Sequence, residues 1–273
     1  MEIEKLIGNT PLINIDGIWC KCEFMNLTGS IKDRIAYEML SHVDITKYDN
    51  VLEITSGNTG ISISALVSWF GLRASIICPQ STSIHKIKLM DLYGAEILCI
   101  DGNIKDCKKH AKLMLKNKYN KKLYFLNQFE NQYNLIAQQK MAFECVMQLS
   151  KQSYDDKIDA IIVGIGTGGT LAGLYKMFPN AIFYTWICDK PIEGTSDGVK
   201  LPLKPKQCNL IEIPIKYNDV IKTQKYLARK GFFVGLSSAA NFHVAQYIKY
   251  GMTGSPRHNI LTIFVDDGKR YLE

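Results

Sequence analysis

Lys32 lies in a polar stretch, Asn26–Arg34, whose residue types could carry covalent chemistry. It follows a turn-like Leu-Thr-Gly-Ser segment and precedes a run with helical character over 35–40. A desolvated lysine can form a Schiff base with a carbonyl compound. A lysine in a charged Lys-Asp-Arg patch is more often an ordinary surface residue, so Lys32 gains meaning only from the segments that accompany it.

A first glycine-rich loop, 55–60, reads Thr-Ser-Gly-Asn-Thr-Gly and joins a β-like run to a helical one. The side chains of Thr55, Ser56, Asn58 and Thr59 converge there with the free N–H groups of a helix start. Such a loop can bind a carboxylate or a phosphate. The alternative is a capping loop whose hydroxyls satisfy the helix N–H groups.

A second glycine-rich loop, 164–170, reads Gly-Ile-Gly-Thr-Gly-Gly-Thr and also follows a strand pattern. It matches G-x-G-x-x-G, and Asp189 follows 20 residues after Gly169, as in dinucleotide-binding folds. The competing interpretation is a cup for one phosphate, because threonine hydroxyls and glycine N–H groups can hold a phosphate dianion. The motif alone leaves both open.

Other reactive residue types show no site pattern. The segment 235–239, Gly-Leu-Ser-Ser-Ala, lacks the last glycine of a G-x-S-x-G nucleophile elbow, so a helix cap is the simpler interpretation. None of the eight cysteines has C-x-x-C spacing, and the five histidines lack H-x-x-x-H spacing. We therefore expect reduced structural thiols and no metal site.

Strand and helix patterns alternate along the chain. Because the strands are apolar, the pattern predicts parallel sheets covered on both faces, with ligands at the carboxyl ends of the strands. Strands are expected over 51–55, 73–78, 96–100, 123–126, 160–163, 181–188, 209–213 and 260–265, and helices over 61–70, 83–93, 134–149, 170–177, 217–230 and 238–249, with a further basic helix after residue 100.

Length and composition narrow the function classes. The 273 residues correspond to about two domains. With 47% hydrophobic and 22% charged residues, a disordered or coiled-coil chain is excluded. No long apolar span and no signal-like N-terminus occur, so we expect a cytoplasmic protein without a membrane partner. The net charge is +7, and part of the positive charge lies in the lysines of 105–122, which predict a solvated helix face. No nucleic-acid-binding motif is present.

Four segments occur in a fixed order along the chain: the one around Lys32, then 55–60, 164–170 and 235–239. In this combination the chain resembles the cysteine synthase (O-acetylserine sulfhydrylase) and cystathionine β-synthase family of pyridoxal-phosphate (PLP) enzymes. The resemblance extends over nearly the whole chain. Supporting segments are Ile-Gly-Asn-Thr-Pro-Leu at 7–12, Tyr-Gly-Ala-Glu at 93–96, Gln-Phe-Glu-Asn at 128–131 and Asp-Gly-Lys-Arg-Tyr-Leu at 267–272.

The resemblance implies PLP fold type II, like the tryptophan synthase β-subunit. This is an α/β fold of two three-layer αβα domains with mostly parallel, twisted sheets. Residues 1–35 and 128–273 would form the large PLP-binding domain, and 36–127 a smaller, mobile domain with the substrate-carboxylate loop. The family also implies a homodimer, with serine acetyltransferase as a possible partner.

The resemblance further implies a role for each matching residue. Lys32 would form the Schiff base with PLP and move the substrate α-proton. The other expected cofactor contacts are Asn58 for the 3′-oxygen, Gly166, Thr167, Gly168 and Thr170 for the phosphate, and Ser237 for the pyridine nitrogen. The substrate α-carboxylate would be bound by Thr55, Ser56, Thr59 and Gln128.

The expected reaction is β-replacement or β-elimination on serine or cysteine derivatives through an aminoacrylate, with cysteine synthase as the leading assignment. The chain departs from the family at 194–198, where Gly-Thr-Ser-Asp-Gly brings in Asp197, and at 141–146. As a general base, Asp197 would favour the rival assignments, a hydrogen-sulfide-producing cysteine lyase or a cystathionine synthase. More distant alternatives are an NAD-dependent oxidoreductase, which leaves Lys32 unexplained, and a non-catalytic paralogue.

Overall fold

The chain folds into two compact units, which we name after their sheets. In this computed structural model the described residues are 2–116, 122–152, 157–195, 203, 205, 207–251 and 259–272. The four-stranded unit comprises Met1–Ile7 and Lys32–Asn134, and the six-stranded unit comprises Gly8–Ile31 and Leu135–Glu273. Lys32 is therefore the residue at which the chain passes from one unit into the other.

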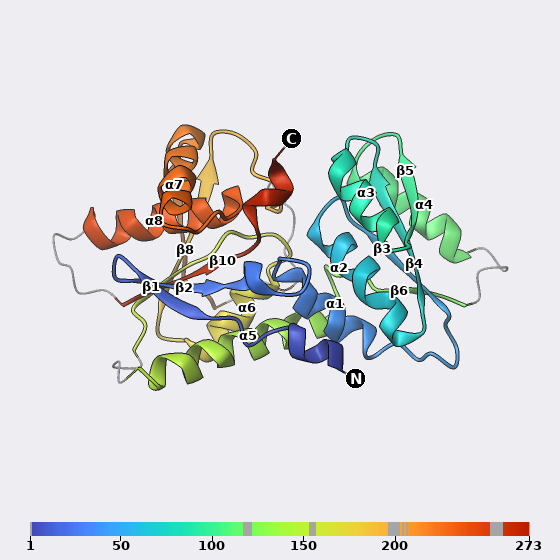
Figure 1. Cartoon of the computed structure of the whole chain (residues 1–273), viewed down its shortest axis with the longest axis horizontal. Helices are drawn as coiled ribbons and strands as arrows, with labels where there is room; N and C mark the ends of the chain where they lie inside the picture. The colour runs from blue at the N-terminus through green and yellow to red at the C-terminus, as the bar shows by residue number, and fades with distance from the viewer. Residues whose placement is uncertain are drawn as a thin grey trace. The chain divides into compact units, whose positions relative to one another are not determined.

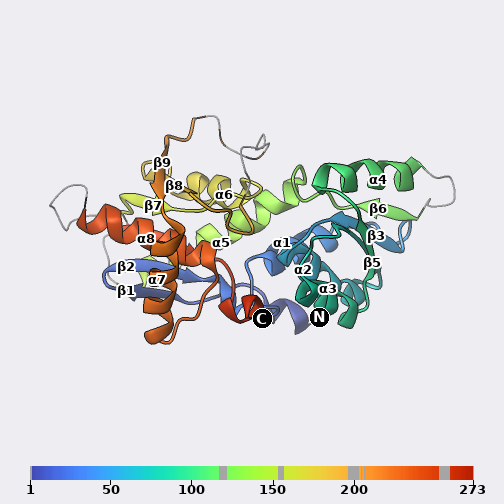
Figure 2. The same ribbon diagram turned by 90° about the horizontal axis from the view of Figure 1, so that it is seen from above.

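The four-stranded unit contains a fully parallel sheet in the order β5-β4-β3-β6. One face is covered by α4, whose Cys107 and Ala111 pack on Leu52 and Ile54 of β3; Figure 2 shows α4 on one side of the strands and α2 and α3 on the other. The bounds are β3 Asn50–Ile54, β4 Arg73–Pro79, β5 Glu96–Ile100, β6 Leu123–Phe125, α1 Lys32–Leu40, α2 Asn58–Leu66, α3 Ile84–Leu92 and α4 Ile104–Lys116.

The six-stranded unit contains a sheet in the order β1-β2-β10-β7-β8-β9. Only β1 and β2 pair antiparallel, joined at Asp16 and Gly17, which both have positive φ. The other neighbours are parallel. The bounds are β1 Leu12–Ile15, β2 Ile18–Cys22, β7 Ala160–Ile162, β8 Ile182–Cys188, β9 Leu210–Ile215, β10 Ile260–Phe264, α5 Gln132–Ser150, α6 Gly169–Met177, α7 Tyr217–Arg229 and α8 Leu236–Tyr250.

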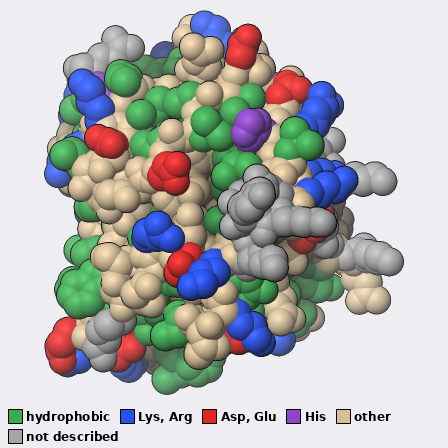
Figure 3. Space-filling model, turned by 90° about the vertical axis from the view of Figure 1, so that its right-hand side faces the viewer, with side chains coloured by type: hydrophobic (Ala, Val, Ile, Leu, Met, Phe, Trp, Pro, Cys, Tyr) green, Lys and Arg blue, Asp and Glu red, His purple; other side chains and the backbone are tan. Residues whose placement is uncertain are grey.

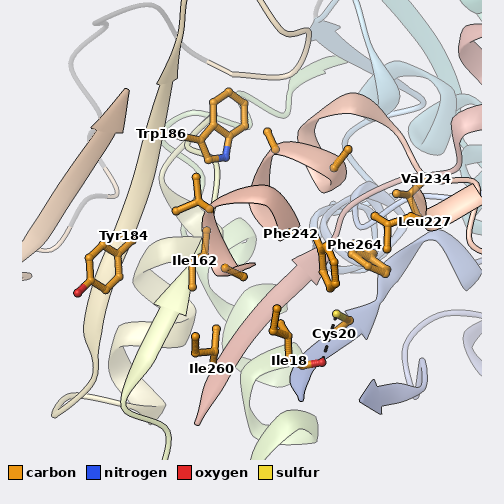
Figure 4. Packing of buried hydrophobic residues seen from close by; sticks show 14 of the residues in the cluster. Ile18, Cys20, Ile162, Tyr184, Trp186, Leu227, Val234, Phe242, Ile260 and Phe264 are labelled. Carbon is orange, nitrogen blue, oxygen red and sulfur yellow. Dashed lines mark hydrogen bonds between the residues drawn. The ribbon is translucent and has the colours of Figure 1, made fainter. Parts of the chain in front are cut away.

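Alternating side chains of the six-stranded sheet pack into two separate hydrophobic cores, one on each face. On β10, Ile260 and Phe264 pack beneath α7 and α8, while Leu261 and Ile263 pack against α5 and α6. Figure 1 shows the two helix pairs on opposite sides of the sheet, and Figure 4 shows Phe242 of α8 beside Phe264. Such double burial is why the central strands β7 and β10 are almost entirely apolar rather than alternating with polar residues.

The structure confirms the predicted fold class of mostly parallel sheets covered by helices. The prediction missed the β1–β2 hairpin, and α1 begins at Lys32 itself, three residues before the expected helical run. The expected helix over 61–70 is divided, because α2 ends at Leu66 and a 3-10 turn follows over Val67–Phe70.

The face of the molecule drawn in Figure 3 has no dominant hydrophobic belt. Figure 3 views the side on which Figure 1 draws β5 and α4, and green hydrophobic patches there are interrupted by tan, blue and red groups. Exposed apolar side chains of this unit include Ile84, Leu92 and Tyr93. None of the helices in the described residues combines the length and apolarity needed to cross a membrane.

Candidate active site

The segment that leads into Lys32 is held by the chain that follows β10. Ile31 N–H donates to the Val265 carbonyl at 2.8 Å, and Ser30 forms an isolated β-bridge with Asp266. Gly29 adopts φ +85°, which glycine reaches without strain, and its carbonyl accepts from Asp267 N–H at 3.0 Å. The 265–271 segment therefore fixes the backbone directly before Lys32.

Lys32 itself is half-buried and begins α1. As expected from the sequence, it follows a turn, but the helix begins at Lys32 itself rather than at Ile35. The segment 267–272 was noted in the sequence only as a supporting motif. Its backbone hydrogen bond to Gly29, and the bond that Arg270 donates to the Thr28 carbonyl, give that motif a physical reason.

The second glycine-rich loop forms an open helix start in the six-stranded unit. Gly168 is the N-cap of α6 with φ +88°, and no side chain caps the helix. The Thr167 hydroxyl accepts from Gly169 N–H at 3.3 Å, and the Thr170 hydroxyl has no partner in the described part of the chain. A Cβ on Gly166 would lie 2.6 Å from the Gly194 carbonyl oxygen, so only glycine fits.

Ser237 lies in the first turn of α8 and is 9% exposed. Among the described residues its hydroxyl makes no hydrogen bond. The next residue, Ser238, is instead used structurally, because its hydroxyl accepts from Val265 N–H at 2.8 Å. Of the two adjacent serines, Ser237 is therefore the one whose hydroxyl no described residue uses.

Asn241 is a residue of this site that the sequence did not reveal. It is fully buried, and its Oδ1 accepts from Gly164 N–H and from Trp186 Nε1, each at 2.8 Å. Its Nδ2 donates to the Ile263 carbonyl at 2.9 Å. One amide thus links the first glycine of the 164–170 loop to β8 and β10. The available signal was an asparagine inside an apolar helix, four residues after Ser237 and hence on the same face.

The first glycine-rich loop is built from side chains in the four-stranded unit. Gly57 is the N-cap of α2 without a side-chain cap, and its N–H donates to the Thr55 hydroxyl at 3.2 Å. The Thr59 hydroxyl donates to Gln128 Oε1 at 2.7 Å, so two predicted carboxylate-binding residues far apart in sequence are brought together. The Ser56 hydroxyl has no partner among the described residues.

Gln128 is held in turn by a buried acid, Glu53 of β3. Glu53 Oε2 accepts from Gln128 N–H at 3.1 Å, and Oε1 accepts from Ile54 N–H at 2.9 Å. Burial raises the pKa of Glu53 to about 8, although these two N–H groups and the charge of Lys108 oppose that rise. Glu53 is therefore a titratable support beneath the loop.

The structure bears differently on the dinucleotide site, on Asp197 and on a metal site. Asp189, the expected ribose ligand of a dinucleotide site, accepts from Tyr217 N–H at 2.7 Å and so closes the turn into α7. Asp197 lies outside the described residues. Among the described residues no group of three or more histidines, cysteines, aspartates or glutamates is placed to hold a metal ion.

Comparison with known proteins agrees with this geometry. Residues 3–185 match the family model described as pyridoxal-phosphate dependent enzyme. The chain belongs to that family. Cysteine synthase B of Campylobacter jejuni is 31% identical over 99% of this chain and 96% of its own length.

Solved structures of the same family extend the similarity. The hydrogen sulfide-producing enzyme of Fusobacterium nucleatum superposes with a TM-score of 0.86 and 30% identity over 99% of this chain and 89% of its own. A variant of that enzyme with aspartate changed to asparagine was solved with an α-aminoacrylate intermediate. The O-acetylserine dependent cystathionine β-synthase of Helicobacter pylori gives 0.86 and 26%, over 99% and 96% of the two chains.

The residues present fit PLP, the cofactor of this family. A helix start with a glycine N-cap and two threonine hydroxyls suits a phosphate dianion. Gly166 has no side chain, and the nearby Gly194 carbonyl leaves no room for one, so no side chain at this position obstructs a bound phosphate. The nearly buried Ser237 hydroxyl, unpaired within the described residues, can hydrogen-bond a ring nitrogen.

Proposed function

We propose that this protein catalyses β-replacement on a serine derivative, with the cysteine synthase reaction, O-acetylserine plus sulfide to cysteine plus acetate, as its main activity. The observation that carries this proposal is Ser237, a neutral hydroxyl that is nearly buried and unpaired within the described residues. When bound, PLP withdraws electrons from the substrate α-carbon, and a neutral partner at its ring nitrogen makes it a weaker electron sink than a carboxylate would. That setting suits prompt loss of a β-substituent over transamination.

The remaining residues receive roles that their chemistry allows. Lys32 would hold the cofactor and then take the proton from the substrate α-carbon. Asn58 would donate to the 3′-oxygen, and Gly166, Thr167, Gly168 and Thr170 would bind the phosphate. Thr55, Ser56, Thr59 and Gln128 would orient the α-carboxylate, which fits a loop whose hydroxyls and helix start favour an anion. The bounds 1–35 plus 128–273 for a PLP-binding domain and 36–127 for a mobile domain remain a prediction.

The test is a product analysis of the PLP-loaded enzyme with O-acetylserine, serine or cysteine, each combined with sulfide or homocysteine. We expect cysteine from O-acetylserine and sulfide to dominate. Lys32→Ala should abolish turnover and the visible absorbance of the bound cofactor, while circular dichroism stays that of the wild type. Lys21 is unsuitable as a control because it is fully buried and paired with Glu144, so the exposed Lys176→Ala serves instead. Full turnover by Lys32→Ala would refute the assignment.

A second candidate is release of hydrogen sulfide from cysteine, or condensation with homocysteine. It is supported by Asp197 at a point where the family tends to have small neutral residues, and by the relatives that make sulfide or cystathionine. In one of those relatives an aspartate-to-asparagine change accompanies a trapped intermediate. We propose that Asp197 is a general base that activates water or a thiol.

Asp197→Asn tests the second candidate. General-base assistance is worth roughly 10²–10⁴-fold. Stopped-flow absorbance of the second half-reaction should slow by that amount with homocysteine or water. With sulfide, which is already largely ionised near neutral pH, the change should be small. Equal and negligible changes with all three nucleophiles would make Asp197 a solvated loop residue and favour plain cysteine synthase.

We further propose a cytoplasmic homodimer, with serine acetyltransferase as a possible partner. Support comes from the sequence resemblance to a family with this organisation. Light scattering of the purified holoenzyme should give about twice the mass of one chain, and a monomer at micromolar concentration would contradict the assembly. Mixing with a serine acetyltransferase tests the partner separately.

A further inference from the structure

Cys78 and Cys99 lie directly opposite one another on neighbouring parallel strands. The register of β4 and β5 pairs the two residues, and their Sγ atoms are 3.7 Å apart. Paired residues of adjacent strands have Cα atoms roughly 4.8 Å apart, which falls inside the roughly 4.4–6.8 Å that disulfides span. The two sulfurs can therefore come together to form a bond while the strands keep their pairing and register.

The two thiols differ in access. Cys78 is buried, whereas Cys99 is exposed on β5, an edge strand of its sheet. Burial raises the pKa of Cys78 to about 11, so at neutral pH it is a protonated thiol. An oxidant from solvent thus meets Cys99 first, with Cys78 immediately behind it. This is the arrangement of an accessible sulfur with an adjacent resolving sulfur.

We propose that Cys78 and Cys99 form a modification site, at which a hydroperoxide converts the dithiol into an intramolecular disulfide. In the first step the Cys99 sulfur attacks hydrogen peroxide, the O–O bond breaks, and a sulfenic acid and one water result. In the second step the Cys78 sulfur attacks the Cys99 sulfur, the S–S bond forms, the S–O bond breaks, and a second water leaves. Two thiols lose two electrons, and one peroxide is reduced to two waters.

A backbone hydrogen bond connects the strand that carries Cys78 to the first glycine-rich loop of the same unit. Ile77, the residue before Cys78, accepts from Thr55 N–H through its carbonyl at 3.0 Å. Closing the sulfur separation from 3.7 Å to the roughly 2.05 Å of a bond turns both side chains and fixes the spacing of β4 and β5 at this pair. Any accompanying adjustment of β4 at Ile77 reaches the Thr55 end of the loop through this hydrogen bond, and we expect it to shift that end. This consequence, unlike the modification itself, rests on the proposed function of that loop.

The modification is tested on the PLP-loaded enzyme treated with hydrogen peroxide and then alkylated. Before alkylation the intact mass should be about 2 Da below that of the untreated enzyme, and after alkylation the oxidised enzyme should carry two alkyl groups fewer than the reduced enzyme. Peptide mapping should recover a Cys78–Cys99 linkage that dithiothreitol reverses. Cys99→Ser should abolish the linkage, and Cys78→Ala should leave a dimedone-reactive sulfenic acid at Cys99. Cys188→Ser, which removes another partly accessible thiol, should change neither result.

Two outcomes would overturn the modification site. One is a linkage between Cys99 and the neighbouring Cys107 of α4, and the other is a Cys99 that stays reduced while other cysteines oxidise. The consequence for the loop is measured separately, as the KM for O-acetylserine before and after quantitative oxidation. We expect KM to rise roughly five-fold or more and to recover with dithiothreitol, since small displacements of positioning groups are costly. An unchanged KM would contradict the coupling, whereas absence of turnover before oxidation would count against the proposed function alone.

Discussion

The two glycine-rich loops share one backbone arrangement but differ in the groups that line them. Each follows a parallel strand, opens a helix and has a glycine N-cap without a side-chain cap. In the four-stranded unit the loop is rich in side-chain donors, with Thr59 bonded to Gln128 and Gln128 held by Glu53. In the six-stranded unit it is mostly backbone, and a single amide, Asn241, fixes its start.

The difference fits the two anions proposed for them. Hydroxyl and amide side chains can reorient around a small carboxylate that arrives and leaves in every turnover. Backbone N–H groups at a fixed helix start suit a phosphate that stays bound, because little has to be reorganised to hold it. Substitutions should therefore damage the six-stranded loop mainly through cofactor affinity and the four-stranded loop mainly through substrate KM.

The largest expected contrast is steric. In Gly166→Ala the new Cβ meets the Gly194 carbonyl at 2.6 Å, and backbone must move. In Gly60→Ala the closest atoms are Met90 Sδ at 2.5 Å and Thr55 Cγ2 at 2.9 Å, which are side-chain rather than backbone atoms and lie outside the proposed phosphate loop. We expect PLP affinity to fall by roughly 100-fold or more in Gly166→Ala, and little in Gly60→Ala. Fluorescence titration of the apoenzyme measures both, and equal losses would remove the distinction between a rigid and an adaptable loop.

The second contrast concerns hydroxyl groups. Thr167→Ala with Thr170→Ala removes two potential bonds to a dianion, each worth about 1.5–3 kcal/mol. PLP affinity should fall by tens-fold or more, and the matched double change to serine should retain most of it. Unchanged PLP affinity, or tight binding of NAD by the wild type, would revive the dinucleotide interpretation.

The third contrast asks whether Asn241 supports its loop as Glu53 supports the other. Asn241→Leu leaves Gly164 N–H and Trp186 Nε1 buried without their acceptor, at a cost of about 1–3 kcal/mol each. Urea unfolding should show this loss, and PLP affinity should fall about ten-fold. Trp186→Phe removes the indole bond and part of the ring that packs against Gly164, but it keeps the bond between Asn241 and Gly164 N–H and should lower PLP affinity less. An equal loss in both variants would assign the effect to the indole.

The fourth contrast is a pH dependence confined to the four-stranded unit. The folded pKa of Glu53, about 8, exceeds its ordinary value of 4.5, so the folded state binds this proton more tightly than the unfolded state. The free energy of unfolding should decline as pH rises from 4.5 towards 8 and become level above it, by at most about 5 kcal/mol. Urea midpoints from pH 5 to 8 should show a flatter profile for Glu53→Gln, even if that variant is less stable throughout. An identical slope would contradict the assignment.

The element pattern was predictable because doubly covered parallel strands are apolar runs bounded by glycine, proline and polar residues. The expected strand over 96–100 coincides with β5, and α6 and α7 lie within one residue of expectation. The β1–β2 hairpin was missed although Asp16-Gly17 is a favoured two-residue turn. The short strands on either side carry too little pattern without the long-range pairing that buries them.

The candidate site divides in the same way. Loop residues such as Thr55 and Gly166 can be recognised from the sequence, because clusters of glycines and hydroxyl residues are unusual. Asn241 does not, since a lone asparagine in a helix has many explanations and its partners lie 22 to 77 positions away. The Thr59–Gln128 bond has the same origin, 69 positions apart. Such pairings depend on the packed fold rather than on local spacing.

The place of the β1–β2 hairpin in its sheet has a consequence for synthesis of the chain. Within the described residues β2 has only β1 and β10 as sheet neighbours, and Ile18 pairs with Ile260, which is made 242 residues later. At the ribosome's pace of about 5–20 residues per second, the hairpin waits roughly 10–50 seconds for that strand. A two-stranded ribbon is marginal in water, so for that interval Trp19 and its apolar neighbours lack the strand that buries them. The nascent chain is then most exposed to chaperones and aggregation at its first thirty residues, long before its last strand is translated.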